Sequence, residues 1–152
     1  MPDKNVINIL LADDDKDDRY FFAKALKSLP IPTKLVTVDD GEQLMNYLAE
    51  NKSKLPDILF LDINMPRKNG NECLIEIKSN KDINYFPVIM YSTSLKDTVA
   101  EMLFQNGAHY YLRKGDFKDL VNHLQLVLTM LQGENFQRPS IEEFVLNDIK
   151  VT

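Results

Sequence analysis

The sequence predicts an α/β domain built on a doubly wound, five-stranded parallel sheet, and two observations lead to this prediction. First, five apolar runs of strand length punctuate the chain, at residues 6–12, 34–38, 58–61, 88–91 and 109–112. Second, the stretches between these runs show helical periodicity. Strands and helices that alternate strictly are joined by right-handed crossovers into a parallel sheet with helices on both faces. We therefore expect one such domain over residues 1–131 and a short tail over residues 132–152.

Each apolar run has the features of a strand. The first runs into a pair of acids, Asp13 and Asp14, and the second is rich in β-branched residues. The third is uninterrupted Ile-Leu-Phe-Leu between Pro56 and Pro66, which is typical of a strand buried on both faces. The fourth and fifth end in polar residues. Charge and polarity therefore gather where the expected strands end.

The helices are predicted from apolar residues at helical spacing. The last helix is the clearest, because it carries a stripe at i, i+4, i+7, i+8 and i+11, formed by Leu120, Leu124, Val127, Leu128 and Leu131. The stretch before the second strand contains five apolar candidates, Tyr20, Phe21, Ala23, Ala25 and Leu26. Gly107 follows the fourth helical stretch, where it would form a left-handed C-terminal cap.

Composition narrows the class of protein. A chain of 152 residues that is 44% hydrophobic can bury one sizeable core, and a net charge of −5 disfavours direct binding to nucleic acid or anionic membranes. The lone Cys73 lies in an apolar helical stretch, so we expect a buried, unreactive thiol and a reducing compartment. The first eleven residues fit neither a signal peptide nor a membrane span, and we expect a cytoplasmic protein.

The polar strand ends predict a site. With the flavodoxin-like strand order 2-1-3-4-5, the first and third strands are neighbours at the topological switch point, where ligands bind outside the carboxyl ends of strands. Asp13, Asp14 and Asp62 then converge, and the fourth and fifth strands bring Ser92 and Lys114 to the rim. Asp62 is the central candidate, because it ends a buried strand.

This set of residues suits a divalent cation and a phosphoryl group. Three carboxylates raise one another's pKa unless a cation compensates them, and oxygen ligands suit Mg²⁺ better than Zn²⁺. The two histidines, His109 and His123, are expected to be packing or surface residues. A carboxylate beside Mg²⁺, with Lys114 and the Ser92 hydroxyl nearby, can act as a nucleophile and form an aspartyl phosphate.

These residues resemble those of the receiver domain of two-component response regulators, the CheY-like fold, in a single-domain form. The resemblance covers roughly residues 6–131 and rests on the Asp13-Asp14 pair, Asp62 in Leu-Asp-Ile-Asn-Met-Pro, Ser92 after Pro-Val-Ile-Met-Tyr, and Lys114. It implies that Asp62 accepts a phosphoryl group from a sensor histidine kinase or a phosphotransfer protein. It also implies that the activated domain signals through protein contacts of its 4-5 face, the side of the domain that carries the fourth and fifth helices. The downstream protein is unknown.

The resemblance also assigns roles within the site. Asp14 would bind Mg²⁺ directly, Asp13 largely through water, and Asn64 through its backbone carbonyl. Tyr111 would be the aromatic switch that turns inward when the Ser92 hydroxyl engages the phosphate. Any catalysis would be limited to the protein's own phosphorylation and dephosphorylation.

One departure concerns Lys114. The family usually has a proline after this lysine, in a cis peptide, and here Gly115 follows. A cis bond without proline costs about 2.5–4 kcal/mol, so the sequence leaves the peptide either trans or cis under strain.

Two other functions and two roles for the tail stay open. The chain could be a phosphorylation-independent adaptor, or a phosphatase of the haloacid-dehalogenase type, although that type needs an acid where Asn64 stands. In the tail, Ser140 and Glu143 form a capping-box pattern before a short amphipathic helix. This segment would pack back on the domain or contribute to a homodimer, and it is too short for a DNA-binding output domain.

Overall fold

The parallel sheet has the strand order predicted from the sequence. The structure is a computed structural model that describes residues 5–93, 96–133 and 136–146. Its strands pair in parallel in the order β2-β1-β3-β4-β5, so β5 and β2 form the edges. The strands are β1 Ile7–Ala12, β2 Thr33–Val38, β3 Ile58–Leu61, β4 Val88–Ser92 and β5 Tyr110–Arg113. The fifth strand therefore begins one residue later than expected, and His109 precedes it.

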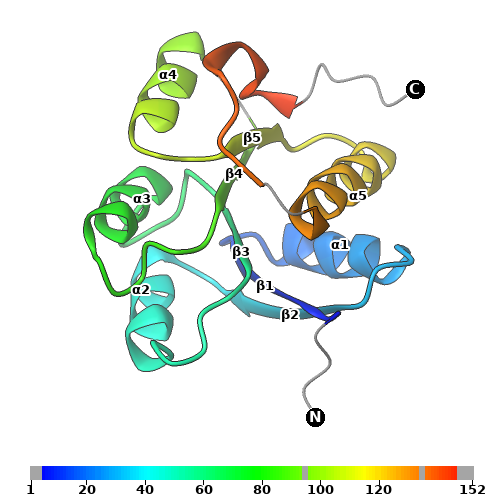
Figure 1. The fold of residues 1–152 in the computed structure, drawn as a ribbon, viewed down its shortest axis with the longest axis horizontal. Coiled ribbons are helices and arrows are strands. Elements are labelled where there is room, and N and C mark those ends of the chain that lie inside the picture. The colour runs from blue at the N-terminus through cyan, green and yellow to red at the C-terminus, as the bar shows by residue number, and fades with distance from the viewer. Residues whose placement is uncertain (1–4, 94–95, 134–135, 147–152) are drawn as a thin grey trace.

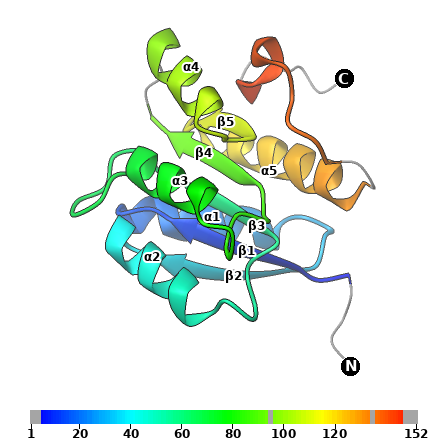
Figure 2. The ribbon, with the colours of Figure 1, turned by 60° about the vertical axis from the view of Figure 1, so that its left-hand side comes forward.

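Five helices cover the two faces of the sheet (Figures 1 and 2). Helices α1 and α5 lie on one face, and α2, α3 and α4 lie on the other. Their bounds are α1 Lys16–Lys27, α2 Gly41–Glu50, α3 Gly70–Ser79, α4 Asp97–Gln105 and α5 Phe117–Gln132. Side-chain caps fix where α1, α2, α3 and α5 begin, with Asp15, Asp40, Asn69 and Asp116 as the N-caps. None of the helices in the described residues is long and apolar enough to cross a membrane.

Alternation along the strands divides the core into two layers. In β3, Leu59 and Leu61 pack toward α2, α3 and α4, whereas Ile58 and Phe60 pack toward α1 and α5. All four side chains are buried, which confirms a strand covered on both faces. The prediction for α1 was wrong in detail, because Phe22 fills the core while Tyr20 and Phe21 are exposed. The apolar periodicity of that helix did not show which of its three consecutive aromatic residues is buried.

Backbone hydrogen bonds hold the carboxyl ends of the strands together. The N–H of Asp13 donates to the carbonyl of Val38 at 3.1 Å, and the N–H of Asp62 donates to Ala12 at 2.9 Å. On the other side, the N–H of Lys114 donates to the carbonyl of Ser92 at 2.7 Å. The backbone that carries the polar residues is thus fixed by the sheet itself.

The tail packs back on the domain, although not as the expected amphipathic helix. It forms a single 3₁₀ turn, Ile141–Glu143, and no side-chain hydrogen bond from Ser140 caps this turn. Val145 then forms a parallel bridge with Tyr111 at the outer edge of β5. Phe144 and Leu146 are fully buried. The helical pattern did not predict which side chains pack, because Ile141 is 41% exposed, and pairing with an edge strand determined the backbone conformation.

Gly107 ends α4 as predicted. Its φ is +103°, its N–H donates to the carbonyl of Phe104, and the N–H of Ala108 donates to Leu103 at 3.1 Å. These two bonds form a Schellman motif, which satisfies carbonyls at the end of the helix.

We predict that Gly107→Ala lowers the free energy of unfolding by about 1–2 kcal/mol, because an L-residue is strained at positive φ. Its added Cβ would also lie 3.0 Å from the side chain of Lys78. Urea denaturation measures the change. The matched control is Gly133→Ala, whose φ of −70° suits any residue and which should change stability by less than about 1 kcal/mol. Equal effects at the two glycines would contradict this interpretation.

Candidate functional site

Three aspartates meet at the carboxyl edge of the sheet, as predicted. Asp13 and Asp14 follow β1, and Asp62 follows β3. One carboxylate oxygen from each lies within 4.8 Å of the others, and the group can hold a metal ion. Asp13 is fully buried and Asp62 is 4% exposed, whereas Asp14 is exposed. The cluster is therefore a buried pair of carboxylates with one carboxylate open to solvent.

Lys114 is the cation at the centre of the site. Its Nζ lies 2.8 Å from Asp13 Oδ2, 2.9 Å from Asp18 Oδ2 and 3.4 Å from Asp62 Oδ2. The side chain is only 9% exposed, and its Nζ lies 5.1 Å from the centre of the Tyr91 ring. The described residues contain no cis peptide bond, so Lys114 is joined to Gly115 in trans. Three carboxylates thus hold the ammonium in a chain that lacks the family's usual proline.

Burial and like charge disfavour ionised carboxyls here. Burial is the largest effect on Asp62 and raises the pKa of its carboxyl to about 7, with Lys114 opposing the shift and Asp13 adding to it. Burial also raises the pKa of Asp13. For Lys114, burial alone would lower the pKa, but hydrogen bonds to Asp13 and Asp18 raise it. One ammonium therefore only partly offsets the carboxylates, and the site favours a further cation.

Ser92 and Tyr111 form the second polar pair. Ser92 is the last residue of β4, is 1% exposed, and lies on the strand next to β3. Tyr111, on the neighbouring strand β5, is fully buried, and its side chain lies on the same face of the sheet as that of Ser92. Burial raises the pKa of the Tyr111 phenol, and Ser92 lowers it by less. The predicted switch aromatic is therefore in its inward position in this structure.

The loop after β3 holds Asp62 against α3. The N–H of Gly70, the first residue of α3, donates to the carbonyl of Ile63 at 2.8 Å. A Cβ on Gly70 would lie 2.1 Å from the carbonyl oxygen of Asp62, so only glycine allows this close approach. Asn64 lies in the same loop, two residues after Asp62, and is exposed.

Sequence reasoning missed three contributors to the site. Asp15 caps the start of α1 and Asp17 lies in its first turn, but the third acid of this segment, Asp18, forms an ion pair with Lys114. Tyr91 lies beneath the ammonium, although the fourth strand offered no sign of this role. Phe21 and Phe117 form an exposed edge-to-face pair, 6.4 Å between ring centres, on the rim next to Lys114. These contacts depend on the direction of single side chains, which leaves no pattern in one sequence.

The remaining titratable candidates lie outside this site. Cys73 is fully buried, and burial raises the pKa of its thiol to about 11, as expected of an unreactive cysteine. His109 stacks on Phe136 with 5.7 Å between ring centres, and burial lowers its pKa to about 4. His123 is half-buried in α5. His109 is thus a packing residue and His123 is partly exposed, which agrees with the expectation that the two are packing or surface residues.

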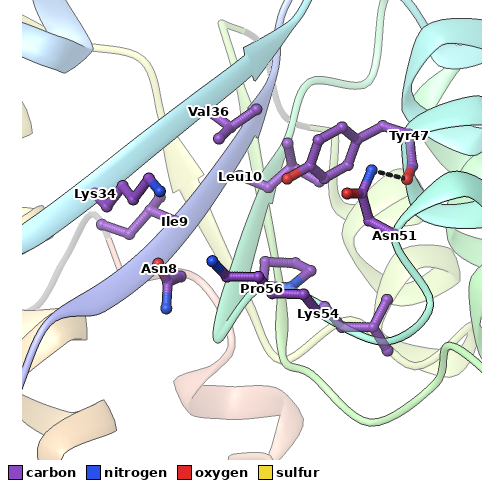
Figure 3. A pocket seen from close by; sticks show the side chains of 10 residues that line it. Asn8, Ile9, Leu10, Lys34, Val36, Tyr47, Asn51, Lys54 and Pro56 are labelled. Carbon is purple, nitrogen blue, oxygen red and sulfur yellow. Dashed lines mark hydrogen bonds between the residues drawn. The ribbon is translucent and has the colours of Figure 1, made fainter. Parts of the chain in front are cut away.

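A cavity of about 220 Å³ lies near the amino ends of the strands, away from the aspartates (Figure 3). Asn8 and Lys34 line it from the amino ends of β1 and β2, and Tyr47 of α2 and Asn51, the C-cap of α2, line it from the helix. Asn51 donates a hydrogen bond to the carbonyl of Tyr47 at 2.8 Å. Because the aspartates lie at the carboxyl ends of the strands, this cavity is separate from their site.

Comparison with known proteins agrees with the geometry. The model of one protein family, the response regulator receiver domain, matches residues 9–125. The response regulator Rcp1 of Synechocystis sp. is 33% identical over 122 residues, which cover 77% of this chain and 83% of Rcp1. A probable methanogenesis regulatory protein of Methanothrix harundinacea, FilR2, is 28% identical over 131 residues, with 84% of each chain covered.

Solved structures agree in fold. The Mn²⁺-bound form of Rcp1 superposes with a TM-score of 0.75 at 29% identity, covering 88% of this chain and 99% of that one. The phosphorylated cyanobacterial phytochrome response regulator RcpA gives a TM-score of 0.76 with the same identity and coverage. In both, the similarity extends beyond the family match, because 88% of the chain exceeds residues 9–125.

We predict that Asp62→Asn stabilises the metal-free protein at pH 8. The folded-state pKa of Asp62 is about 7, and the usual unfolded value is about 3.9, so ionisation opposes folding increasingly as pH rises between these values. At pH 8 the substitution should raise the free energy of unfolding by roughly 1–3 kcal/mol, and the gain should vanish near pH 4.

Urea denaturation in the presence of a chelator, at several pH values, measures this difference. Glu101→Gln is the matched control, because Glu101 is an exposed acid on α4. Its effect should stay within about 0.5 kcal/mol at every pH. A destabilised Asp62→Asn protein at pH 8 would show that the Lys114 contact outweighs the burial of the carboxylate.

Proposed function

Because the chain belongs to the response regulator receiver domain family, we propose that it accepts a phosphoryl group on Asp62 and then signals by contacting another protein. The observation that carries this proposal is the position of the Lys114 ammonium, 3.4 Å from Asp62 and 2.8 Å from Asp13. An adaptor that does not use phosphorylation has no need to bury a lysine among carboxylates.

In the proposed reaction, a carboxylate oxygen of Asp62 attacks the phosphorus of a phosphohistidine on a sensor kinase or phosphotransfer protein. The new O–P bond forms as the N–P bond breaks, and the imidazole leaves with the bonding electron pair. Lys114 places positive charge next to the equatorial oxygens, and the Ser92 hydroxyl donates a hydrogen bond to one of them. No general base is needed, because a cation held by the aspartate cluster would lower the raised pKa of Asp62 and keep its carboxyl ionised.

Mg²⁺ is the cation that we assign to the aspartate cluster. Asp13, Asp14, Asp62 and the backbone carbonyl of Asn64 would hold it, and these donors are all oxygen atoms. When bound, it supplies positive charge that offsets the charge of the phosphoryl oxygens. Two carboxylates of this cluster have raised pKa values, which supports a site built for a cation.

The proposal extends to the location of the protein and to its partners. The protein acts in the cytoplasm, does not bind DNA directly, and signals through the surface formed by α4, β5 and α5. Its catalysis is limited to its own phosphorylation and dephosphorylation. RcpA is a phytochrome response regulator, and a phytochrome-like sensor kinase is the donor class that this similarity favours.

We predict that acetyl phosphate with Mg²⁺ produces a slower band on a phosphate-affinity gel for the wild type, and that Asp62→Asn removes this band. Acetyl phosphate transfers its phosphoryl group to Asp62 and releases acetate. Ser92→Ala should slow the reaction by about 10- to 1,000-fold, because one donor to the phosphoryl oxygens is lost. A chelator should abolish it.

The matched control is Asp57→Asn, because Asp57 precedes β3 at the opposite edge of the sheet. This variant should shift like the wild type. An equal shift for Asp62→Asn would show that the phosphoryl group goes elsewhere. Rapid multiple turnover of p-nitrophenyl phosphate by the wild type would instead favour the phosphatase.

We also expect the exposed aromatic pair beside Lys114 to contact the protein that donates the phosphoryl group. Phe21 is 45% exposed and Phe117 is 38% exposed, and large exposed aromatic groups are typical of interfaces. With a sensor kinase that phosphorylates the wild type, Phe21→Ser should slow transfer by about tenfold or more. Transfer from acetyl phosphate should not change.

Tyr85→Ser is the control, because Tyr85 is 77% exposed but lies before β4, at the amino edge of the sheet. Its kinase reaction should match that of the wild type. Equal slowing by Phe21→Ser with both donors would place Phe21 in the chemistry rather than in docking.

A further inference from the structure

A segment after α5 crosses the outer edge of the sheet, and we name residues 136–146 the C-terminal strap. In Figures 1 and 2 it is the orange to red segment that returns from α5 and lies beside β5 and α4. The edge strand β5 belongs to the surface that we assign to signalling. The contacts of the strap therefore bear on how that surface is controlled.

The strap is joined to β5 through the backbone of Tyr111. The N–H of Tyr111 donates to the carbonyl of Phe144 at 3.0 Å, and Tyr111 and Val145 form a parallel bridge. An edge strand exposes N–H and C=O groups that seek a partner, and here the chain supplies its own. The strap thus acts as a short sixth strand at this residue.

Buried side chains anchor the strap in both layers of the core. Phe144 packs with the residues under α4 and meets Phe104 edge-to-face, with 5.5 Å between ring centres. Leu146 packs in the layer under α5. Both side chains are fully buried, so the strap closes the core at the edge of β5.

A second set of contacts fastens the strap to the end of α4. Arg138 donates hydrogen bonds to the carbonyls of Phe104 and Ala108, and its guanidinium lies 4.4 Å from the centre of the Phe104 ring. A cation is favourable at the carbonyl end of a helix. Phe136 stacks on His109, directly before β5. The strap is therefore held at several points along its length.

Tyr111 connects the strap to the phosphoryl site. Its backbone N–H is bonded to the strap, and its side chain lies on the same face of the sheet as that of Ser92, on the neighbouring strand. Ser92 is the residue to which we assign the hydrogen bond with the phosphoryl group. Phe144 packs in the same layer of the core as Tyr111, and this layer encloses the ring in its inward position.

We propose that docking of the C-terminal strap on β5 and phosphorylation of Asp62 stabilise each other, with the inward Tyr111 as the element that both require. This inference rests on the proposed phosphoacceptor function. Loss of the strap removes the partner of the Tyr111 N–H and part of the wall around its ring. Because coupling between two binding events is reciprocal, whatever the strap contributes to the phosphorylated state, phosphorylation returns to the strap.

Phe144→Ser tests this coupling. The probe is beryllofluoride with Mg²⁺, which occupies the position of a phosphoryl group on a carboxylate, and its affinity is measured by NMR titration. We expect the substitution to weaken binding by roughly 5- to 150-fold, the range of typical couplings between sites. Ile141→Ser is the matched control, because Ile141 is an apolar strap residue that is 41% exposed. Its affinity should stay within about twofold of the wild type.

Hydrogen exchange gives the reciprocal measurement. Beryllofluoride should slow exchange of the Tyr111 N–H in the wild type, because that group donates to Phe144. If Phe144→Ser does not fold, Arg138→Ala replaces it, since it removes the bonds to the end of α4 while leaving the buried side chains in place. It should also weaken beryllofluoride binding and speed this exchange.

The outcomes separate the coupling from the function on which it rests. Failure of the wild type to bind beryllofluoride would overturn the phosphoacceptor function itself. Normal binding by a strap variant whose Tyr111 N–H exchanges freely would overturn the coupling alone. A wild-type affinity that changes with protein concentration would also overturn it, because the strap would then act between two copies of the chain.

Discussion

The burial of carboxylates around a single ammonium is the constraint on which the rest of this structure depends. Asp13 and Asp62 lie at the ends of neighbouring buried strands, and Lys114 reaches both from the far side of the site. Isolated buried charges are costly, so the arrangement persists only because the three groups compensate one another. The raised pKa of Asp62 shows that the compensation is incomplete. A site in this state has an unmet preference for positive charge, which is the physical basis for binding a cation.

The sheet makes this arrangement possible because its hydrogen bonds fix the backbone independently of the interactions between these side chains. Asp62 is tied to the end of β1 through Ala12, and Lys114 is tied to the end of β4 through Ser92. The backbone of Asp62 therefore cannot move away from the end of β1, which carries Asp13, without breaking a sheet hydrogen bond. The strands in turn are held by a core on both faces, where alternate residues of β3 pack against different helices. The stable core thus keeps the like charges of Asp13 and Asp62 close together. In a less rigid fold the two carboxylates would move apart and reduce their repulsion.

The sequence predicted those features that depend on local pattern and on general rules of topology. The parallel sheet follows from strict alternation of strands and helices, and the convergence of Asp13, Asp14 and Asp62 follows from the flavodoxin-like strand order. Contacts that depend on a particular side-chain direction were out of reach. Asp18 is one of several acids in its segment, and the sequence does not show that this one faces Lys114. For the same reason, three adjacent aromatic residues in α1 did not reveal that Phe22 is buried.

The conformation of the tail was also beyond the reach of local sequence pattern, and the edge of β5 explains it. The tail was predicted to form a short amphipathic helix, but a helix and an added strand can both bury a residue such as Phe144. The unpaired edge of β5 favours the strand, because the N–H of Tyr111 would otherwise lack a partner in the sheet. Tyr111 belongs both to the edge of the sheet and to the polar site, because its backbone pairs with the tail and its phenol lies near Ser92. A change in the conformation of Tyr111 at the edge of β5 would therefore also be felt at the polar site, so this one residue links the protection of the edge to the proposed response to phosphorylation.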